Sequence, residues 1–360
     1  MRSVTKTILA ALLASAFMVT SLPASAETIL GALAKAYQNN SELNSARAGV
    51  RVTDEGVAIA KSGYRPTIVG AASVDYSNRW TQNTTFRGGT ATFGIQLNQT
   101  LFDGFQTRNN VAAAEAKVQA SNEGLRNTEQ NVLFSAASAY MDVIRDRQIA
   151  ALTEQNLQFL TEQVRAARSR LEVGEGTRTD VAQAEASRSA AVARASAARA
   201  QALASAAAYR QIVGEEPGKL KAASPLAKAL PKSLEAAIAI AASEHPAILA
   251  NEHLVDAAAF AVKSAEGALL PQLSASAGVS QNYSYQSPLP ISPSGDPTSA
   301  SIGATLTIPI YTGGRVDAIV RQSKETLGQA RIEVDVSRDQ VRNAVTSAWT
   351  QYVAAREAID

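Results

Sequence analysis

Apolar and polar residues alternate one by one along four stretches of the chain, and this period of two predicts strands with one apolar and one polar face. Two of the stretches form a predicted β-hairpin over residues 66–101, and the other two form a second hairpin over residues 271–310. The second hairpin shows the pattern most clearly. Its last stretch sets Ile302, Ala304, Leu306, Ile308 and Ile310 against Ser301, Gly303, Thr305 and Thr307.

Strands of this kind occur in two different structures. A transmembrane β-barrel turns the apolar side of each strand to lipid and the polar side to its lumen. A water-soluble β-sandwich has the same alternation, with the apolar side turned to its core. The strands alone do not distinguish a barrel from a sandwich, so the evidence has to come from the segments between them.

Long helices follow the first hairpin and disfavour a sandwich. Residues 105–173 contain no proline and a single glycine, Gly124, and a wholly helical segment of that length would reach about 100 Å. A second helix is predicted over residues 179–213, and it ends at Gly214. Neither two nor four strands close a barrel, and lipid does not tolerate open sheet edges. A barrel built from these strands therefore requires several chains.

The order helix, hairpin, long helix occurs twice along the sequence. Pro66 and Pro271 precede the two hairpins 205 residues apart, whereas Gly104 and Gly313 follow them 209 residues apart. We expect a first structural repeat over residues 27–225, with a tip turn over residues 173–178, and a second over residues 226–360. Because proline and glycine landmarks recur in order, the likeness exceeds what an alanine-rich composition produces by chance.

The N-terminus has the pattern of a secretory signal peptide. Arg2 and Lys6 precede an apolar run over residues 8–19, and Ala24-Ser25-Ala26 is a small-x-small cleavage pattern. We expect a signal peptide over residues 1–26, a mature chain that starts near Glu27, and export of the protein. The alternatives are a buried helix or a membrane anchor, but the run is short for spanning a bilayer.

Composition narrows the classes of function. The chain has 34 Lys and Arg against 32 Asp and Glu, and both excess positive charges lie in the predicted signal peptide. A neutral mature chain has no bulk field that attracts nucleic acid. The absence of cysteine excludes disulfides, thiol nucleophiles and an N-terminal lipidated cysteine. Alanine is the commonest residue in the hydrophobic fraction of 46%, which suits closely packed helices better than a thick core.

The sequence has no phosphate loop, nucleophile elbow or zinc-protease helix, so we expect no enzyme, cofactor or metal. The two histidines, His245 and His253, each follow a glutamate and could hold zinc, but Pro246 interrupts their register and solvated surface side chains are the favoured interpretation. The run Gly313-Gly314-Arg315 could receive an anion, although a turn between a strand and a helix is the simpler interpretation.

The mature chain resembles the TolC family of outer-membrane efflux proteins. The resemblance lies in the duplicated unit, the two strand entries, the junctions Leu101-Phe102-Asp103-Gly104 and Ile310-Tyr311-Thr312-Gly313, and the turn Val173-Gly174-Glu175-Gly176-Thr177-Arg178-Thr179-Asp180-Val181. It implies a mainly α protein with β: a homotrimer with a twelve-stranded β-barrel in the Gram-negative outer membrane and a helical barrel in the periplasm. The implied function is passive export of drugs or secreted proteins. The implied partners are a periplasmic adaptor, an inner-membrane pump and outer-membrane lipid.

The same resemblance assigns roles to the turn between the long helices. Val173, Gly174, Gly176 and Thr177 would form the periplasmic tip where the adaptor docks, unless the turn is purely structural. Thr179 and Asp180 would begin the inner helix at the aperture gate. From the residues alone, Asp180 could equally cap that helix.

Two other classes of exported protein also have long helices. A periplasmic adaptor would place a β-rich segment between its helical halves, and an adhesin or filament subunit would lack two matched pairs of strands. A complete second repeat would carry its own tip turn about 209 residues after the first. We therefore expect this sequence, which ends at Asp360, to be a C-terminally truncated piece of its protein.

Overall fold

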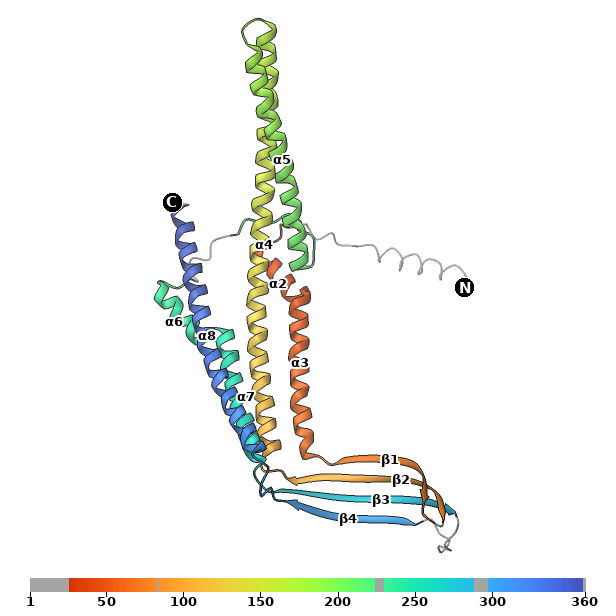
Figure 1. Ribbon diagram of the computed structural model, residues 1–360. Helices are drawn as coiled ribbons and strands as arrows, with labels where there is room; N and C mark the ends of the chain where they lie inside the picture. The colour runs from red at the N-terminus through yellow and green to blue at the C-terminus, as the bar shows by residue number, and fades with distance from the viewer. Residues whose placement is uncertain (1–25, 83, 224–229, 288–296, 359–360) are drawn as a thin grey trace, which may run out of the picture. The chain divides into compact units, whose positions relative to one another are not determined.

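A computed structural model describes residues 26–82, 84–223, 230–287 and 297–358 (Figure 1). All but the last residue of the predicted signal peptide lies outside these residues. No described helix has an apolar stretch long enough to cross a bilayer. The helices are α2 (Ile29–Asn39), α3 (Ser41–Lys61), α4 (Gln106–Glu172), α5 (Arg178–Val213), α6 (Leu234–Glu244), α7 (Pro246–Gly267) and α8 (Arg315–Glu357); the strands are β1 (Thr67–Trp80), β2 (Thr85–Phe102), β3 (Gln272–Ser287) and β4 (Thr298–Thr307).

The described chain forms two compact units that cut across the two sequence repeats. One unit combines the chain up to Asn44 with Thr128–Leu230, and it holds α2, α5 and most of α4. The other combines Ser45–Asn127 with the chain from Pro231, and it holds the strands and α6 to α8. The division of the sequence into repeats at residue 226 stays a prediction.

The elements recur in the same order at the two spacings seen in the sequence. Helix α2 begins at residue 29 and α6 at residue 234, and β1 begins at residue 67 and β3 at residue 272; both pairs are 205 residues apart. Helix α4 begins at residue 106 and α8 at residue 315, which are 209 residues apart. Each half thus has two short helices, a hairpin and the start of a long helix.

Both hairpins join one four-stranded antiparallel sheet in the order β1-β2-β3-β4. The second hairpin is shorter than the sequence predicts, because β4 ends at Thr307 and leaves Ile308 and Ile310 outside the strand. Thr307 pairs with Gln272, the first residue of β3. Residues beyond Thr307 therefore have no partner on β3, and Pro309 has no N–H group for a ladder.

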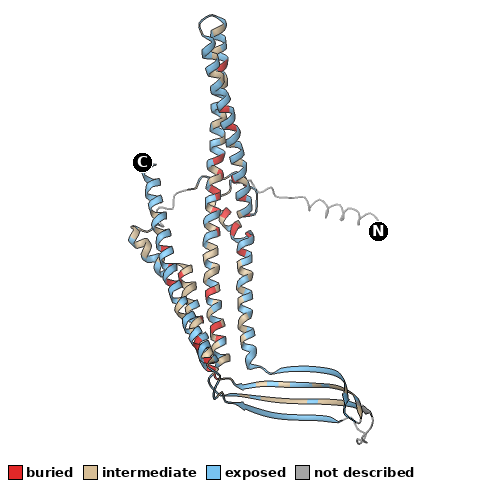
Figure 2. Cartoon of the chain, viewed as in Figure 1, coloured by how far each residue is buried: buried red, intermediate tan, exposed pale blue. Residues whose placement is uncertain are grey.

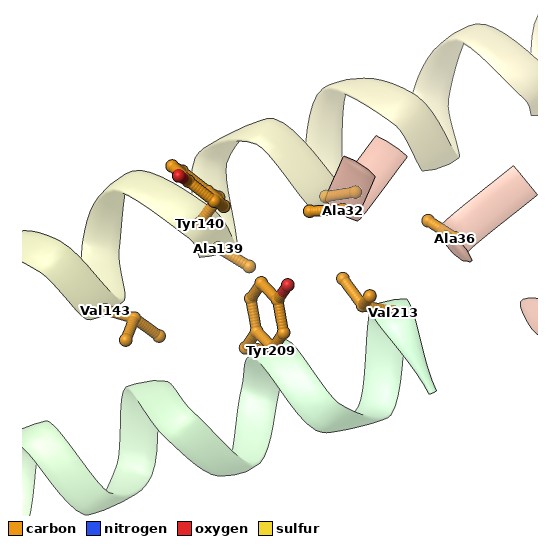
Figure 3. Packing of buried hydrophobic residues seen from close by; sticks show 8 residues of the cluster. Ala32, Ala36, Ala139, Tyr140, Val143, Tyr209 and Val213 are labelled. Atoms are coloured by element: carbon orange, nitrogen blue, oxygen red, sulfur yellow. The ribbon is translucent and has the colours of Figure 1, made fainter. Parts of the chain in front are cut away.

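Helix packing in the first unit is built mainly from small residues. Tyr140 of α4 and Tyr209 of α5 are fully buried, and Tyr209 points from α5 toward α4 (Figure 3). Alanine packs around them, which lets the helices approach closely. The cluster comprises Ala32, Ala36, Ala136, Ala139, Tyr140, Val143, Tyr209 and Val213.

In the second unit, α7 and α6 pack against α8 around Ile248, Val334 and Val341. Two polar contacts support the same helix pair: the side-chain amide of Asn251 donates to Ser337, and Arg338 pairs with Glu252. Figure 2 shows that most buried positions lie on the helices, and no strand residue with described burial is buried. The sheet is therefore uncovered on both faces in the single chain.

Candidate functional site

One face of the sheet is mostly apolar across all four strands, with Gln99, Gln281 and Thr298 among its polar exceptions. Residues directly opposite one another in a sheet share a face, and the row Ile68–Leu97–Ala277–Ile302 crosses β1 to β4. The next row crosses the sheet at Ile95 and Val279. We call this surface the apolar sheet face: Ile68, Gly70, Ala72, Val74, Tyr76, Phe93, Ile95, Leu97, Leu273, Ala275, Ala277, Val279, Ala300, Ile302, Ala304 and Leu306.

Large side chains of the apolar sheet face are exposed. Ile302 is 90% exposed, Val74 84% and Ile68 67%, and the rings of Phe93 and Tyr283 stack on this face with their centroids 6.0 Å apart. A contiguous apolar patch of this kind marks a surface that contacts lipid or another protein. The sheet thus has the outer face that a membrane barrel requires, whereas a sandwich would have covered it.

The opposite face, which we call the polar sheet face, carries mostly small polar side chains, and Asp75 and Arg79 are its charged residues. Its rows include Thr67–Asn98–Ser276–Gly303, and Thr92 Oγ1 lies 3.3 Å from Asn282 Oδ1 on the same face. Charged residues in the four strands number only three: Asp75, Arg79 and Arg87. Such a surface can line a water-filled passage without strong attraction to either sign of charge.

Both edges of the sheet are open within the described chain. Strands β1 and β4 are outermost, so each has one side without a neighbouring strand. All three pairings are antiparallel, so β1 and β4 run in opposite directions. The β4 edge of one copy could therefore continue the antiparallel pattern on the β1 edge of another.

The passage from the first hairpin into α4 contains a helix cap that the sequence analysis missed. The Asp103 carboxylate accepts hydrogen bonds from Thr107 N at 2.6 Å and from Thr107 Oγ1 at 2.5 Å. Gly104 and Phe105 follow with φ values of 69° and 66°. An acidic residue four positions before a threonine is too common a spacing to have identified this cap from sequence alone.

The second junction forms a turn, the simpler of the two sequence interpretations. Gly313 and Gly314 have φ values of 64° and 78°, and Gly314 precedes the first residue of α8. Positive φ is open to glycine at little steric cost. The glycine pair therefore redirects the chain from β4 into α8.

The tip turn begins with a Schellman motif at the end of α4. Glu175 N donates to the carbonyl of Arg170 at 2.8 Å, and Gly174 N donates to the carbonyl of Leu171 at 3.1 Å. Gly174 has a φ of 81°, the left-handed conformation that this motif needs. Val173 beside it is 71% exposed. The exposed valine is an apolar contact point at the end of the helix pair.

The second glycine of the tip, Gly176, acts differently from the first. Gly176 does not have positive φ. A Cβ there would lie 3.2 Å from Leu171 N and 3.3 Å from Arg170 C, tighter than most real contacts. Gly176 therefore lets the returning chain pass close to the last turn of α4.

A capping box opens α5. Thr177 N donates to Asp180 Oδ2 at 2.9 Å, and Asp180 N donates to Thr177 Oγ1 at 3.2 Å. The Thr177 hydroxyl and then the Thr177 main chain hold the pKa of Asp180 below its usual value. The capping alternative for Asp180 is therefore present in the structure. Thr179 lies exposed between the two, and the gate role of Thr179 and Asp180 stays a prediction.

The two histidines do not come together. His245 Nδ1 accepts a hydrogen bond from Ala247 N at 3.2 Å and so caps α7, while His253 Nδ1 lies 4.0 Å from Asp256 on the same helix. Among the described residues, no group of three or more acidic or histidine side chains is arranged to hold a metal ion. His245 therefore has a local structural role.

Comparison with known proteins gives one consistent family. The model of the family described as "Outer membrane efflux protein" matches residues 32–215 and 237–360. The outer membrane efflux protein BepC of Brucella suis is 55% identical over 352 residues, covering 98% of this chain and 75% of BepC. The outer membrane protein TolC of Escherichia coli is 23% identical, covering 93% of this chain and 70% of TolC.

Solved channel structures share the fold. The outer-membrane channel CmeC of Campylobacter jejuni superposes with a TM-score of 0.72 at 16% identity, over 91% of this chain and 73% of CmeC. The outer membrane protein VceC of Vibrio cholerae gives 0.71 at 18% identity, over 92% of this chain and 80% of VceC. The expected fold class, long helices with four strands per chain, is confirmed.

Proposed function

The chain belongs to the TolC family of outer-membrane efflux proteins, and on this premise we propose how its strands and helix tip form an export duct. The protein is an outer-membrane channel of an efflux system. In our proposal, several copies close one barrel, with the apolar sheet face in lipid and the polar sheet face around the lumen. The observation that carries the proposal is the pairing register, because it places the apolar residues of all four strands on one uncovered face.

The number of copies follows from barrel geometry. Open strand edges are not tolerated in lipid, so β1 and β4 must find partners in other copies. Two copies would supply eight strands, and an eight-stranded barrel is just wide enough for its own side chains. Three copies would supply twelve strands and leave a passage. We therefore favour a homotrimer with a twelve-stranded barrel.

Passive transport suits the chemistry of the polar sheet face. Its Ser, Thr, Asn and Gln side chains offer hydrogen bonds without a strongly charged or enzymatic site. The family consists of channels and not of enzymes, and we propose that this chain likewise has no catalytic step. Energy for export would then come from an inner-membrane pump, reached through a periplasmic adaptor.

The helix tip is the proposed docking point for that adaptor. Val173, Gly174, Gly176 and Thr177 lie at the turn between α4 and α5, and Val173 presents an exposed apolar side chain. The Schellman motif and the capping box hold the turn in one shape, which favours recognition by a preformed partner surface. Thr179 and Asp180, next to the tip, remain the candidates for the gate.

The protein isolated from outer membranes tests this function. Native mass spectrometry should give the mass of three chains, and the complex should form discrete channels in planar bilayers. A monomer in the outer membrane, or a trimer that forms no channels, would contradict the proposal. Crosslinking from Thr177→Cys should capture the adaptor in cells; in a working efflux system without such adducts, the tip would be a structural turn only.

A further inference from the structure

Glu27, the predicted first residue of the mature chain, is fixed by main-chain hydrogen bonds. Glu27 N donates to the carbonyl of Lys219 at 2.7 Å, and the carbonyl of Glu27 accepts from Lys221 N at 2.9 Å. The hydroxyl of Tyr140 lies 2.7 Å from the same Glu27 carbonyl oxygen. The residue next to the predicted cleavage site is thus an anchored part of the first unit.

The side chains around Glu27 lack one positive charge. Lys35 Nζ lies 3.0 Å from Glu27 Oε1 and 2.7 Å from Glu215 Oε2, so two carboxylates share one ammonium group. Neither carboxylate pairs with another cation in the described part of the chain. The Glu27 side chain is only 15% exposed, which limits the screening of its charge by water. We call Glu27, Lys35, Tyr140, Tyr209 and Glu215 the Glu27 node.

The node also contains a buried hydroxyl without a hydrogen bond. The hydroxyl of Tyr209 has no hydrogen-bond partner among the described residues. Tyr209 is 0% exposed, and burial, followed by the charge of Glu27, raises the pKa of its hydroxyl. Figure 3 shows its oxygen in the space that α4, α5 and α2 surround. A buried hydroxyl without a partner indicates that the node can take one more hydrogen-bonding group.

We propose that the Glu27 node is the seat of the α-ammonium group formed when a signal peptidase cuts between Ala26 and Glu27. Hydrolysis adds the hydroxyl of water to the Ala26 carbonyl carbon and a proton to Glu27 N, and a second proton from solvent gives the ammonium. The nitrogen keeps its bond to Lys219 and gains two donors and a positive charge. Cleavage therefore neutralises the node and adds hydrogen-bond donors to it.

The identity and the reactivity of the N-terminal amine, measured on protein isolated from outer membranes, test this inference. Intact mass and N-terminal sequencing should place the first residue at Glu27. The rate of acetylation by an N-hydroxysuccinimide ester should then be followed against pH for folded and unfolded protein. Two carboxylates at the node raise the pKa of the amine, and each unit of rise makes acetylation about tenfold slower near neutral pH. Steric shielding alone would slow the reaction without moving its pH midpoint.

Variants that remove one carboxylate distinguish an α-ammonium group paired with the Glu27 node from one that is only shielded by burial. Glu215→Gln lies far from the cleavage site in sequence, and it should lower the pH midpoint of acetylation toward that of the unfolded chain. Glu27→Gln should do the same, whereas Glu42→Gln, an exposed residue of α3, should not. A mature chain that begins elsewhere would overturn the inference. A midpoint equal to that of the unfolded chain, or unchanged in both node variants, would overturn it too.

Discussion

Gly104 and Gly267 meet main chain to main chain where the first hairpin enters α4 and where α7 ends. The carbonyl oxygen of each glycine lies where a Cβ atom of the other would stand, too close for any side chain. Gly104 also has a φ of 69°. This contact joins a residue of the first sequence repeat to one of the second, and only glycine permits it.

Gly267→Ala should therefore destabilise the second unit. The added methyl would overlap the carbonyl of Gly104, and overpacking of this kind costs about 1–3 kcal/mol. Gly328→Ala is the matched control, since no atom lies within 4 Å of its Cβ position in α8. The control should be neutral or stabilise by about 0.5–1 kcal/mol. Thermal unfolding of the two variants measures the difference, and equal melting temperatures would contradict the contact.

The capping box predicts pH-dependent fraying at the start of α5. The pKa of Asp180 is lower in the folded chain than its ordinary value of 3.8, so the cap is fully present above that pH and is lost as the pH falls through the folded pKa. Hydrogen exchange of the first-turn amides of α5 should accelerate only in that acid range. Asp180→Asn should remove the pH dependence. Thr177→Ala should increase exchange at all pH values, because loss of an N-cap costs about 0.5–2 kcal/mol.

His245 predicts a second pH dependence nearer neutrality. Burial lowers the pKa of His245 from its ordinary value of 6.5, so the unfolded chain binds the proton first as the pH falls. Stability should therefore decrease below about pH 6.5 and level off below the folded pKa. Unfolding at stepped pH values measures the effect. His245→Asn keeps a capping side chain without titrating and should abolish it, whereas His253→Asn should leave it in place.

Single-channel conductance distinguishes the gate role of Asp180 from its capping role. If Asp180 makes a closing contact, Asp180→Ala should raise the conductance of the assembled channel above that of the natural protein. Thr177→Ala breaks the same capping box while it keeps the carboxylate. It should leave conductance unchanged. A rise in both variants would assign the effect to the cap, and a rise in neither would leave Asp180 as a helix cap.

Most of the fold could be predicted from local sequence patterns, because strand alternation and helix ends depend on residues that are close together in the chain. The period-two alternation located both hairpins, and the antiparallel register then aligned residues such as Ile68, Leu97 and Ile302 on one face. Gly174 and Asp180 were also recognisable, since a helix end needs a left-handed residue and a helix start favours a carboxylate. The end of β4 was missed because it depends on where β3 begins.

Contacts between distant residues could not be predicted in the same way. Gly104 and Gly267 are separated by almost half of the mature chain, and nothing near either residue indicates its partner. The burial of Tyr209 beside Glu27 likewise depends on how α5 meets the N-terminal segment. Gly267, at the end of an alanine-rich helix, does indicate a close contact, because glycine lowers helix stability and is expected there only where the main chain of another segment comes close.

The central claim is that the two faces of the sheet meet lipid and lumen, and cysteine accessibility tests it most directly. The chain has no cysteine, so single variants in assembled trimers in liposomes report one position each. Thr305→Cys and Ser301→Cys should react with a membrane-impermeant maleimide, whereas Leu306→Cys and Ile302→Cys should stay unlabelled. Labelling of Leu306→Cys as readily as Thr305→Cys would contradict the assignment of the faces.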